Sequence, residues 1–447
     1  SVGRLLWKLA VPTVIAQLVN MLYNIVDRIY IGHIPGDGSL ALTGVGVCLP
    51  IIMIISAFSA FVSSGGAPRA SIAMGRGDYD QAQRILGGCF TLQVGISLVL
   101  TAVLLIWNRP LLLAFGASGN TIGYAVQYMQ IYALGTLFVE LTLGLNAFIT
   151  AQGFAQVGMK TVLIGAVCNI LLDPLFIFGG LGIPAMGVAG AAVATVIGQI
   201  VAFLLAMVCH FRKNPEVRLS RKGMRLHRSV MKSILAVGVP SIIMVAIGSV
   251  MNFTMNQILI GFTSTAVAVF GAYFKLQSFI FMPIFGLNNA MVSIVAYNYG
   301  ARKPDRIRKA VLFSCLAAFL FMLCGFAVFQ LMPEVLLSMF DPTAEFLAIG
   351  CKALQTISWA FPIAGFCVVL SSVFQALGTG LYATIVSLAR QLLVLLPVAY
   401  LLSLSGRLEL VWWSFPIAEM ASITVTALLL LRIYRQKLRP ILEEQRA

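Results

Sequence analysis

LAVPTVIAQLVNMLYNIVDRIYIG, residues 9–32, is the stretch that decides the class of this protein. It is long enough to cross a hydrocarbon core of about 30 Å as a helix, yet it contains amides and a carboxylate without turn residues around them. Apolar runs of this length recur along the 447-residue chain, of which 60% is hydrophobic and only 10% charged. Soluble proteins carry about 25% charged residues, so this composition predicts a polytopic membrane protein.

Turn residues and charges divide the chain into twelve predicted membrane helices. The protein is therefore expected to be all-α, and both termini should lie on the same side of the membrane because the number of spans is even. The predicted spans are 5–33, 40–66, 85–107, 122–149, 157–180, 186–211, 231–262, 266–292, 308–331, 346–375, 381–404 and 409–434.

Positive charge is concentrated in alternate linkers. Most of the 30 Lys and Arg residues lie near the amino terminus, in every second linker and in the carboxy-terminal tail. Loops that stay in the cytoplasm show this excess, so both termini are predicted to be cytoplasmic. The net charge of +15 is thereby explained by membrane topology and contact with membrane lipid, and no nucleic-acid partner is expected.

The two halves of the sequence resemble each other. Residues 9–32 align with VGVPSIIMVAIGSVMNFTMNQILIG (237–261), and residues 148–167 align with 373–392. A duplicated six-helix unit is typical of transporters whose halves rock around a central site. The expected fold is an integral membrane protein with twelve transmembrane helices in two pseudo-symmetric six-helix lobes around a central cavity. Its predicted parts are an amino lobe (1–211), a basic cytoplasmic inter-lobe linker (212–230), a carboxy lobe (231–434) and a cytoplasmic tail (435–447).

A polar stripe runs along the first predicted helix. Gln17, Asn20, Asn24 and Asp27 are spaced by three or four residues, which places all four on one helix face. A charge at the centre of a bilayer costs about 3 kcal/mol or more, so such a residue needs a functional or structural reason. The stripe is therefore predicted to face inward, toward a cavity or a partner helix.

A second acid lies in the fifth predicted helix, where Asn169 and Asp173 are one helical turn apart. Within the repeat, Asp27 aligns with Asn256, and the position that corresponds to Asp173 is also not acidic. The needs of packing should be similar in both lobes, yet only the first lobe has these acids. This asymmetry favours a functional role for Asp27 and Asp173.

Several other polar residues lie within predicted spans. Thr195 ends the small-residue run GVAGAAVAT (187–195), which permits close helix contact and would let its hydroxyl reach the fifth helix. Arg390 and Glu419 are attributed to structural roles. The further candidates for a cavity or coupling function are Gln17, Asn24, Glu140, Asn252, Asn256 and Lys275.

The sequence contains no motif that predicts catalysis. Its 3 His residues are scattered, and its 8 Cys residues lie in or beside apolar segments without paired spacing. We therefore expect neither an enzyme nor a bound cofactor.

The motifs together resemble the multidrug and toxic compound extrusion (MATE) family of transporters. The resemblance covers essentially the whole chain and rests on LAVPTVIAQLVNMLYNIVDRIYIG, GGAPRASIAMGRGD, ITAQG, NILLDP, GVAGAAVAT and WWSFPIAE, in the order of the family. It implies a secondary active antiporter that works as a monomer in the bacterial plasma (inner) membrane. Such proteins export organic, often cationic and lipophilic compounds by alternating access, in exchange for protons or sodium ions.

The resemblance also implies roles for individual residues. Pro12 matches the proline at which the first helix is proposed to bend when the site is protonated. The acids through which other branches couple in the carboxy lobe have no counterpart here, so coupling is expected in the amino lobe. The residues that match the proton- or sodium-binding cluster of a prokaryotic branch are Asp27, Asn169, Asp173, Thr195 and, where that cluster often has glutamine, Asn20.

Two alternative functions fit the same pattern. A dedicated exporter of one metabolite has no sequence feature that separates it from a multidrug pump. A flippase for a lipid-linked precursor belongs to the same wider superfamily. Flippases of that kind often have additional spans and a more cationic central cavity, whereas few Arg or Lys residues lie inside the spans of this chain.

Overall fold

The computed structural model describes residues 1–213, 217–340 and 343–447. Within these ranges the chain is helical, and its only β-type pairing is an isolated bridge between Gly180 and Ile183. The predicted all-α membrane fold is therefore confirmed. Residues 214–216 of the predicted linker lie outside the described residues.

The helices of the first half agree with the predicted spans. Helices dominate because backbone N–H and C=O groups find no water in hydrocarbon and must bond to one another. The span predicted at 122–149 consists of two helices that meet at Gly135 with a bend of 55°. The helices are α1 (Val2–Gly32), α2 (Gly38–Gly75), α3 (Tyr79–Ala114), α4 (Ile122–Leu134), α5 (Thr136–Ala151), α6 (Ala155–Phe178) and α7 (Val188–Val208), followed by the π-helical turn η1 (Cys209–Lys213).

The second half repeats this pattern with more interruptions. Among the described residues, eleven helical segments are long and apolar enough to cross a membrane, and the bent pair α4–α5 brings the number to the predicted twelve. The elements are α8 (Arg228–Ile260), α9 (Ser264–Gly300), α10 (Pro304–Leu331), α11 (Pro333–Ser338), α12 (Ala344–Ile357), η2 (Ser358–Ala360), α13 (Phe361–Ala376), α14 (Gly380–Leu388), η3 (Ala389–Leu395), α15 (Leu396–Ser403), α16 (Leu408–Val411), α17 (Ser414–Ile433), η4 (Tyr434–Leu438) and α18 (Arg439–Arg446).

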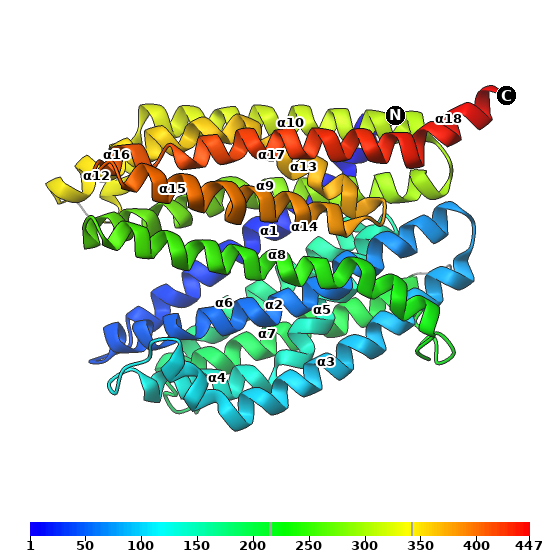
Figure 1. The fold of residues 1–447 in the computed structure, drawn as a ribbon. Helices are drawn as coiled ribbons and strands as arrows, with labels where there is room; N and C mark the ends of the chain where they lie inside the picture. The colour runs from blue at the N-terminus through cyan, green and yellow to red at the C-terminus, as the bar shows by residue number, and fades with distance from the viewer. Residues whose placement is uncertain (214–216, 341–342) are drawn as a thin grey trace. The chain divides into compact units, whose positions relative to one another are not determined.

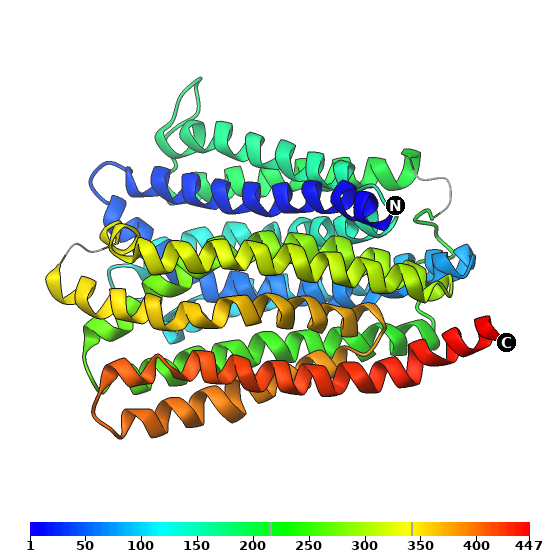
Figure 2. The same ribbon diagram turned by 90° about the horizontal axis from the view of Figure 1, so that it is seen from above.

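Two compact units make up the chain: an amino unit, Lys8–Gly238, and a carboxy unit, Ser1–Trp7 with Val239–Ala447. The division falls inside α1 and α8, close to the prolines that align in the sequence repeat, Pro12 and Pro240. Both ends of the chain belong to the carboxy unit and lie at the same end of it (Figures 1 and 2). The chain therefore passes from one unit to the other within a helix in both places, once in α1 and once in α8.

Small residues set the distance between helices in the amino unit. Helices α6 and α7 form its most extensive helix pair, and Gly165 and Gly198 lie where they cross. A Cβ atom on Gly198 would lie 2.8 Å from the carbonyl oxygen of Gly165. Close backbone approach through small residues replaces the hydrophobic effect as the cause of helix association in lipid. The same crossing brings Asn169 of α6 beside Thr195 of α7.

The predicted basic linker is attached to the amino unit. The hydroxyl of Thr91 in α3 donates to the carbonyl oxygen of Met224 at 2.7 Å. Next to this bond, Gly87 and Gly223 approach so closely that a Cβ on Gly87 would lie 2.1 Å from the carbonyl carbon of Gly223. The described part of the linker thus packs on α3 before α8 begins.

An aromatic cluster and an ion pair characterise the carboxy unit. The buried rings of Phe270 and Trp412 lie 6.4 Å apart between centroids. Arg390, in the π-helical turn η3, has its Nη1 atom 3.4 Å from Oε1 of Glu419 in α17. The two charges lie in largely apolar helices, where each gives the other a partner. The sequence does not reveal this pairing.

We predict that Gly198→Ala lowers the thermal stability of the protein in detergent micelles. The new methyl group would overpack the α6–α7 crossing, which typically costs about 1–3 kcal/mol. Gly95→Ala in α3 is the matched control, because a Cβ there meets nothing within 4 Å and alanine favours a helix. Equal midpoints of thermal unfolding for Gly198→Ala and Gly95→Ala would show that the α6–α7 crossing tolerates a methyl group.

We also predict that Arg390→Gln and Glu419→Gln are non-additive. Loss of one partner leaves the other charge unpaired in apolar surroundings, which typically costs about 3–5 kcal/mol. The double variant should therefore be more stable at neutral pH than the sum of the single effects predicts. Unfolding curves of the four proteins in one lipid–detergent mixture measure the coupling, and simple additivity would mean that the pair contributes nothing.

Candidate functional site

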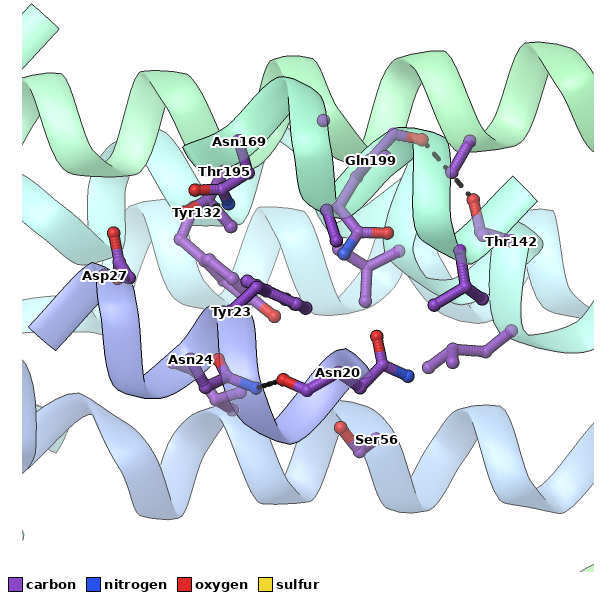
Figure 3. A pocket seen from close by; sticks show the side chains of 18 of the residues that line it. Asn20, Tyr23, Asn24, Asp27, Ser56, Tyr132, Thr142, Asn169, Thr195 and Gln199 are labelled. Atoms are coloured by element: carbon purple, nitrogen blue, oxygen red, sulfur yellow. Dashed lines mark hydrogen bonds between the residues drawn. The ribbon is translucent and has the colours of Figure 1, made fainter. Parts of the chain in front are cut away.

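A cavity of about 230 Å³ lies within the amino unit, between α1, α2 and α4 to α7 (Figure 3). Figure 3 shows Asp27 toward one end of it and Thr142 toward the other. Aliphatic side chains form part of the wall, and most of the other lining residues carry an amide, hydroxyl or phenol group. The polar lining residues are Asn20, Tyr23, Asn24, Asp27, Arg28, Ser56, Tyr128, Tyr132, Thr142, Asn146, Asn169, Thr195 and Gln199.

Two carboxyl groups meet beside this cavity. Asp27 of α1 and Asp173 of α6 are 6% and 0% exposed, and their side chains are within hydrogen-bonding reach of each other. Asp27 lines the cavity, whereas Asp173 lies behind the lining residues. Within the described part of the chain, Oδ1 of Asp27 has no hydrogen-bond partner. A buried oxygen of this kind can accept a proton or a cation.

Asn169 links Asp173 to Thr195. One end of its amide lies 2.9 Å from Oδ2 of Asp173, and the other lies 3.2 Å from Oγ1 of Thr195. When Asp173 is ionised, the amide nitrogen donates to the carboxylate and the amide oxygen accepts from the threonine hydroxyl.

Protonation of Asp173 reverses this chain. The carboxyl group then donates to the amide oxygen, and the amide nitrogen donates to Oγ1 of Thr195. The hydroxyl of Thr195 is free to donate to the carbonyl oxygen of Ala191, 2.9 Å away. The two protonation states of Asp173 therefore correspond to two opposite directions of one hydrogen-bond chain, which ends in the backbone of α7.

Tyrosines, which none of the sequence motifs singles out, complete the site. The side chain of Tyr23, one turn before Asp27, lies within hydrogen-bonding reach of Gln199. The rings of Tyr128 and Tyr132 in α4 stack with a centroid distance of 6.0 Å. A spacing of four residues from Asp27 would have identified Tyr23, because it lies on the same helix face, but aromatic residues are also common in membrane helices without any such role.

The amides of the predicted stripe have different surroundings. Asn20 lines the cavity, and its backbone carbonyl oxygen accepts a hydrogen bond of 2.8 Å from the side chain of Asn24 (Figure 3). Gln17 is not among the lining residues. Pro12 is buried within α1, which continues as one helix through it.

Glu140 forms a separate buried polar site. It is 0% exposed and is not among the residues that line the cavity. Gln93 of α3 donates to its Oε2 at 3.2 Å and also contacts the hydroxyl of Ser59 at 3.4 Å. Among the described residues, the structure therefore places the third buried acid of the amino unit apart from the lining of the cavity beside Asp27 and Asp173.

The remaining candidates belong to the carboxy unit. Asn252 and Asn256 are half-buried in α8, and Lys275 is an exposed residue of α9. The Lys275 ammonium lies 5.9 Å from the centroid of the Phe340 ring. None of these three is among the lining residues of the cavity in the amino unit.

The donor atoms of the site suit a small hard cation. Two carboxyl groups, an amide and a hydroxyl supply oxygen ligands, which hard metal cations prefer to nitrogen or sulfur, and a carboxylate can also take up a proton. The described residues contain no group of three or more His, Cys, Asp or Glu side chains that could hold a metal ion. The chemistry available is therefore reversible binding of a proton or a monovalent cation beside a cavity large enough for part of an organic molecule.

Comparison with known proteins places this fold and site in context. A multidrug export protein MepA of Staphylococcus haemolyticus is 28% identical over 422 residues, which are 94% of this chain and 91% of that protein. A probable multidrug resistance protein YoeA of Bacillus subtilis is 25% identical over 428 residues, 95% and 92% of the two chains.

Solved structures agree with these relatives. An outward-facing structure of a multidrug resistance MATE family transporter of the MOP superfamily has a TM-score of 0.90 and 26% identity, covering 97% of this chain and 96% of that one. The MatE family model matches residues 12–175 and 240–401, one segment in each half. The predicted resemblance is confirmed: the chain belongs to the MatE family and is a multi-pass membrane protein with the fold of a MATE transporter.

Proposed function

We propose that this protein is a secondary active antiporter that exports organic compounds in exchange for protons or sodium ions. The observation that carries the proposal is the contact between Asp27 and Asp173 at the wall of a polar cavity. The relatives named as a multidrug export protein and as a probable multidrug resistance protein support efflux of several organic compounds, which we expect to be often cationic and lipophilic. The protein would act as a monomer in a bacterial plasma membrane, with both termini in the cytoplasm.

The coupling follows from the electrostatics of two acids in contact. Two carboxylates that share an apolar site repel each other, so the pair favours binding of one proton or cation. The bound ion neutralises the wall of the cavity and weakens its attraction for a cationic substrate. Ion and substrate would therefore exclude each other, which is the requirement for exchange.

Alternating access completes the proposed cycle. The ion enters from the side where its concentration is high and favours the conformation from which substrate leaves. On the cytoplasmic side the ion departs, and substrate binds from the cytoplasm or the inner leaflet. The reversible chain from Asp173 through Asn169 to Thr195 offers a route by which ion binding changes hydrogen bonds between α6 and α7.

We predict that Asp27→Asn abolishes the response of efflux to an imposed ion gradient. The variant keeps the size of the side chain but removes a group that can bind a proton or a cation. The measurement is efflux of a fluorescent organic cation from proteoliposomes, with pH and sodium gradients imposed separately. Glu140→Gln is the matched control because its carboxyl group is equally buried in the same unit but lies away from the cavity lining. Unchanged gradient dependence in Asp27→Asn would contradict antiport at this site.

We predict that Thr195→Val lowers the affinity for the coupling ion by about tenfold, which corresponds to roughly 1.4 kcal/mol. Valine matches the shape of threonine but leaves the Asn169 amide without its second partner. Thr195→Ser keeps the hydroxyl and should restore most of the affinity. The ion concentration that gives half-maximal efflux measures the effect, and equal values for the valine and serine variants would rule out a role for the hydroxyl.

A further inference from the structure

Arg28 has no role in the proposed exchange, although it lines the same cavity as Asp27. It is the only Lys, Arg or His among the lining residues of this cavity. Cations inside membrane helices are rare and normally pair with an acid or with backbone carbonyl groups. In the described part of the chain, however, the Arg28 guanidinium makes no hydrogen bond and no ion pair within 4.0 Å.

None of the described acids of the amino unit forms an ion pair with Arg28 within 4.0 Å. Asp27 is near enough to interact electrostatically with Arg28, but its carboxyl group is in hydrogen-bonding reach of Asp173. Glu140 accepts from Gln93. Three more described acids lie at helix ends: Asp37 is within hydrogen-bonding reach of Tyr124, Asp78 accepts from the backbone N–H of Gln81 as a cap of α3, and Asp80 lies in the exposed first turn of α3. The guanidinium is therefore available to a ligand in the cavity.

We propose that Arg28 binds the carboxylate of a zwitterionic amphiphile and thereby sets the substrate class of this transporter. A guanidinium presents a planar fork of donors that matches a carboxylate and can bind it through two parallel hydrogen bonds. The rings of Tyr128 and Tyr132 and the aliphatic side chains of the wall would contact the organic body of the ligand. This inference rests on the proposed function and assigns the chemistry of its substrate.

The presence of Asp27 in the same wall favours a zwitterion over a simple anion. Neighbouring residues of α1 place opposite charges at one cavity, so a ligand with a cationic and an anionic group satisfies both. A purely cationic ligand would be attracted by Asp27 but repelled by Arg28. Exchange is preserved, because an ion that binds to the acids displaces the cationic group of the ligand and thereby weakens the binding of the whole ligand.

A pair of dyes tests this assignment directly. Tetramethylrhodamine carries a cationic ring system and a free carboxylate, whereas its methyl ester has the same ring system and only the positive charge. Binding of each dye to the purified full-length protein in detergent is measured by fluorescence anisotropy at one pH. We expect the wild type to bind the free acid more tightly than the ester.

Substitution of Arg28 should remove this preference. In Arg28→Gln the affinity for the free acid should fall by about tenfold or more, while the affinity for the ester should be unchanged or higher. Arg28→Lys keeps the charge but loses the fork, so its preference should be intermediate. Arg109→Gln is the matched control, because Arg109 is an exposed residue of α3 in the same unit and does not line the cavity.

The outcomes separate the two proposals. A wild type that binds and exports the ester without any preference for the free acid would overturn the role of Arg28 and leave antiport intact. An equal loss of both dyes in Arg28→Gln would also overturn it, since the effect would then not depend on the carboxylate. If proteoliposomes export neither dye under a pH or a sodium gradient, the proposed function fails, and the assignment of Arg28 fails with it.

Discussion

The absence of water from the hydrocarbon core is the constraint on which the rest of this structure depends. It forces the backbone into helices, and it requires each buried polar side chain to find a partner inside the protein. Thr91 satisfies this requirement through a linker carbonyl group, Glu140 through an amide and Glu419 through an arginine. Asp27 and Asp173 meet it differently, because each has an acid as its neighbour. Two groups that repel each other when ionised favour a shared proton or cation, which is the physical basis of the proposed exchange.

The two halves share a fold but differ in how they use charge. In the carboxy unit, the charges of Arg390 and Glu419 neutralise each other within one contact. In the amino unit, Asp27 and Arg28 line a cavity and form no ion pair within 4.0 Å among the described residues. The two halves therefore share a helical pattern but differ in the arrangement of their charged residues.

The sequence predicts much of the fold because hydrophobic length and linker charge are local properties. The twelve spans and the face shared by Asn20, Asn24 and Asp27 follow from spacing along one helix. Contacts between helices do not follow from spacing. The distance from Arg390 to Glu419, the bond from Gln93 to Glu140 and the approach of Tyr23 to Gln199 all depend on which helices are neighbours and how they are rotated. Arg28 shows the limit best: neighbouring residues of a helix lie about 100° apart around its axis, yet Arg28 lines the same cavity as Asp27, because a long side chain can reach around its own helix.

The division of the chain inside α1 and α8 affects the backbone hydrogen bonds at the two crossings. The first turns of α1 belong to the carboxy unit, and the first turns of α8 belong to the amino unit. Pro12 and Pro240 lie within a few residues of these divisions, and a proline has no N–H group to donate to the carbonyl oxygen four residues earlier. Each leading helix therefore lacks one rung of its hydrogen-bond ladder close to the point where the chain passes from one unit to the other.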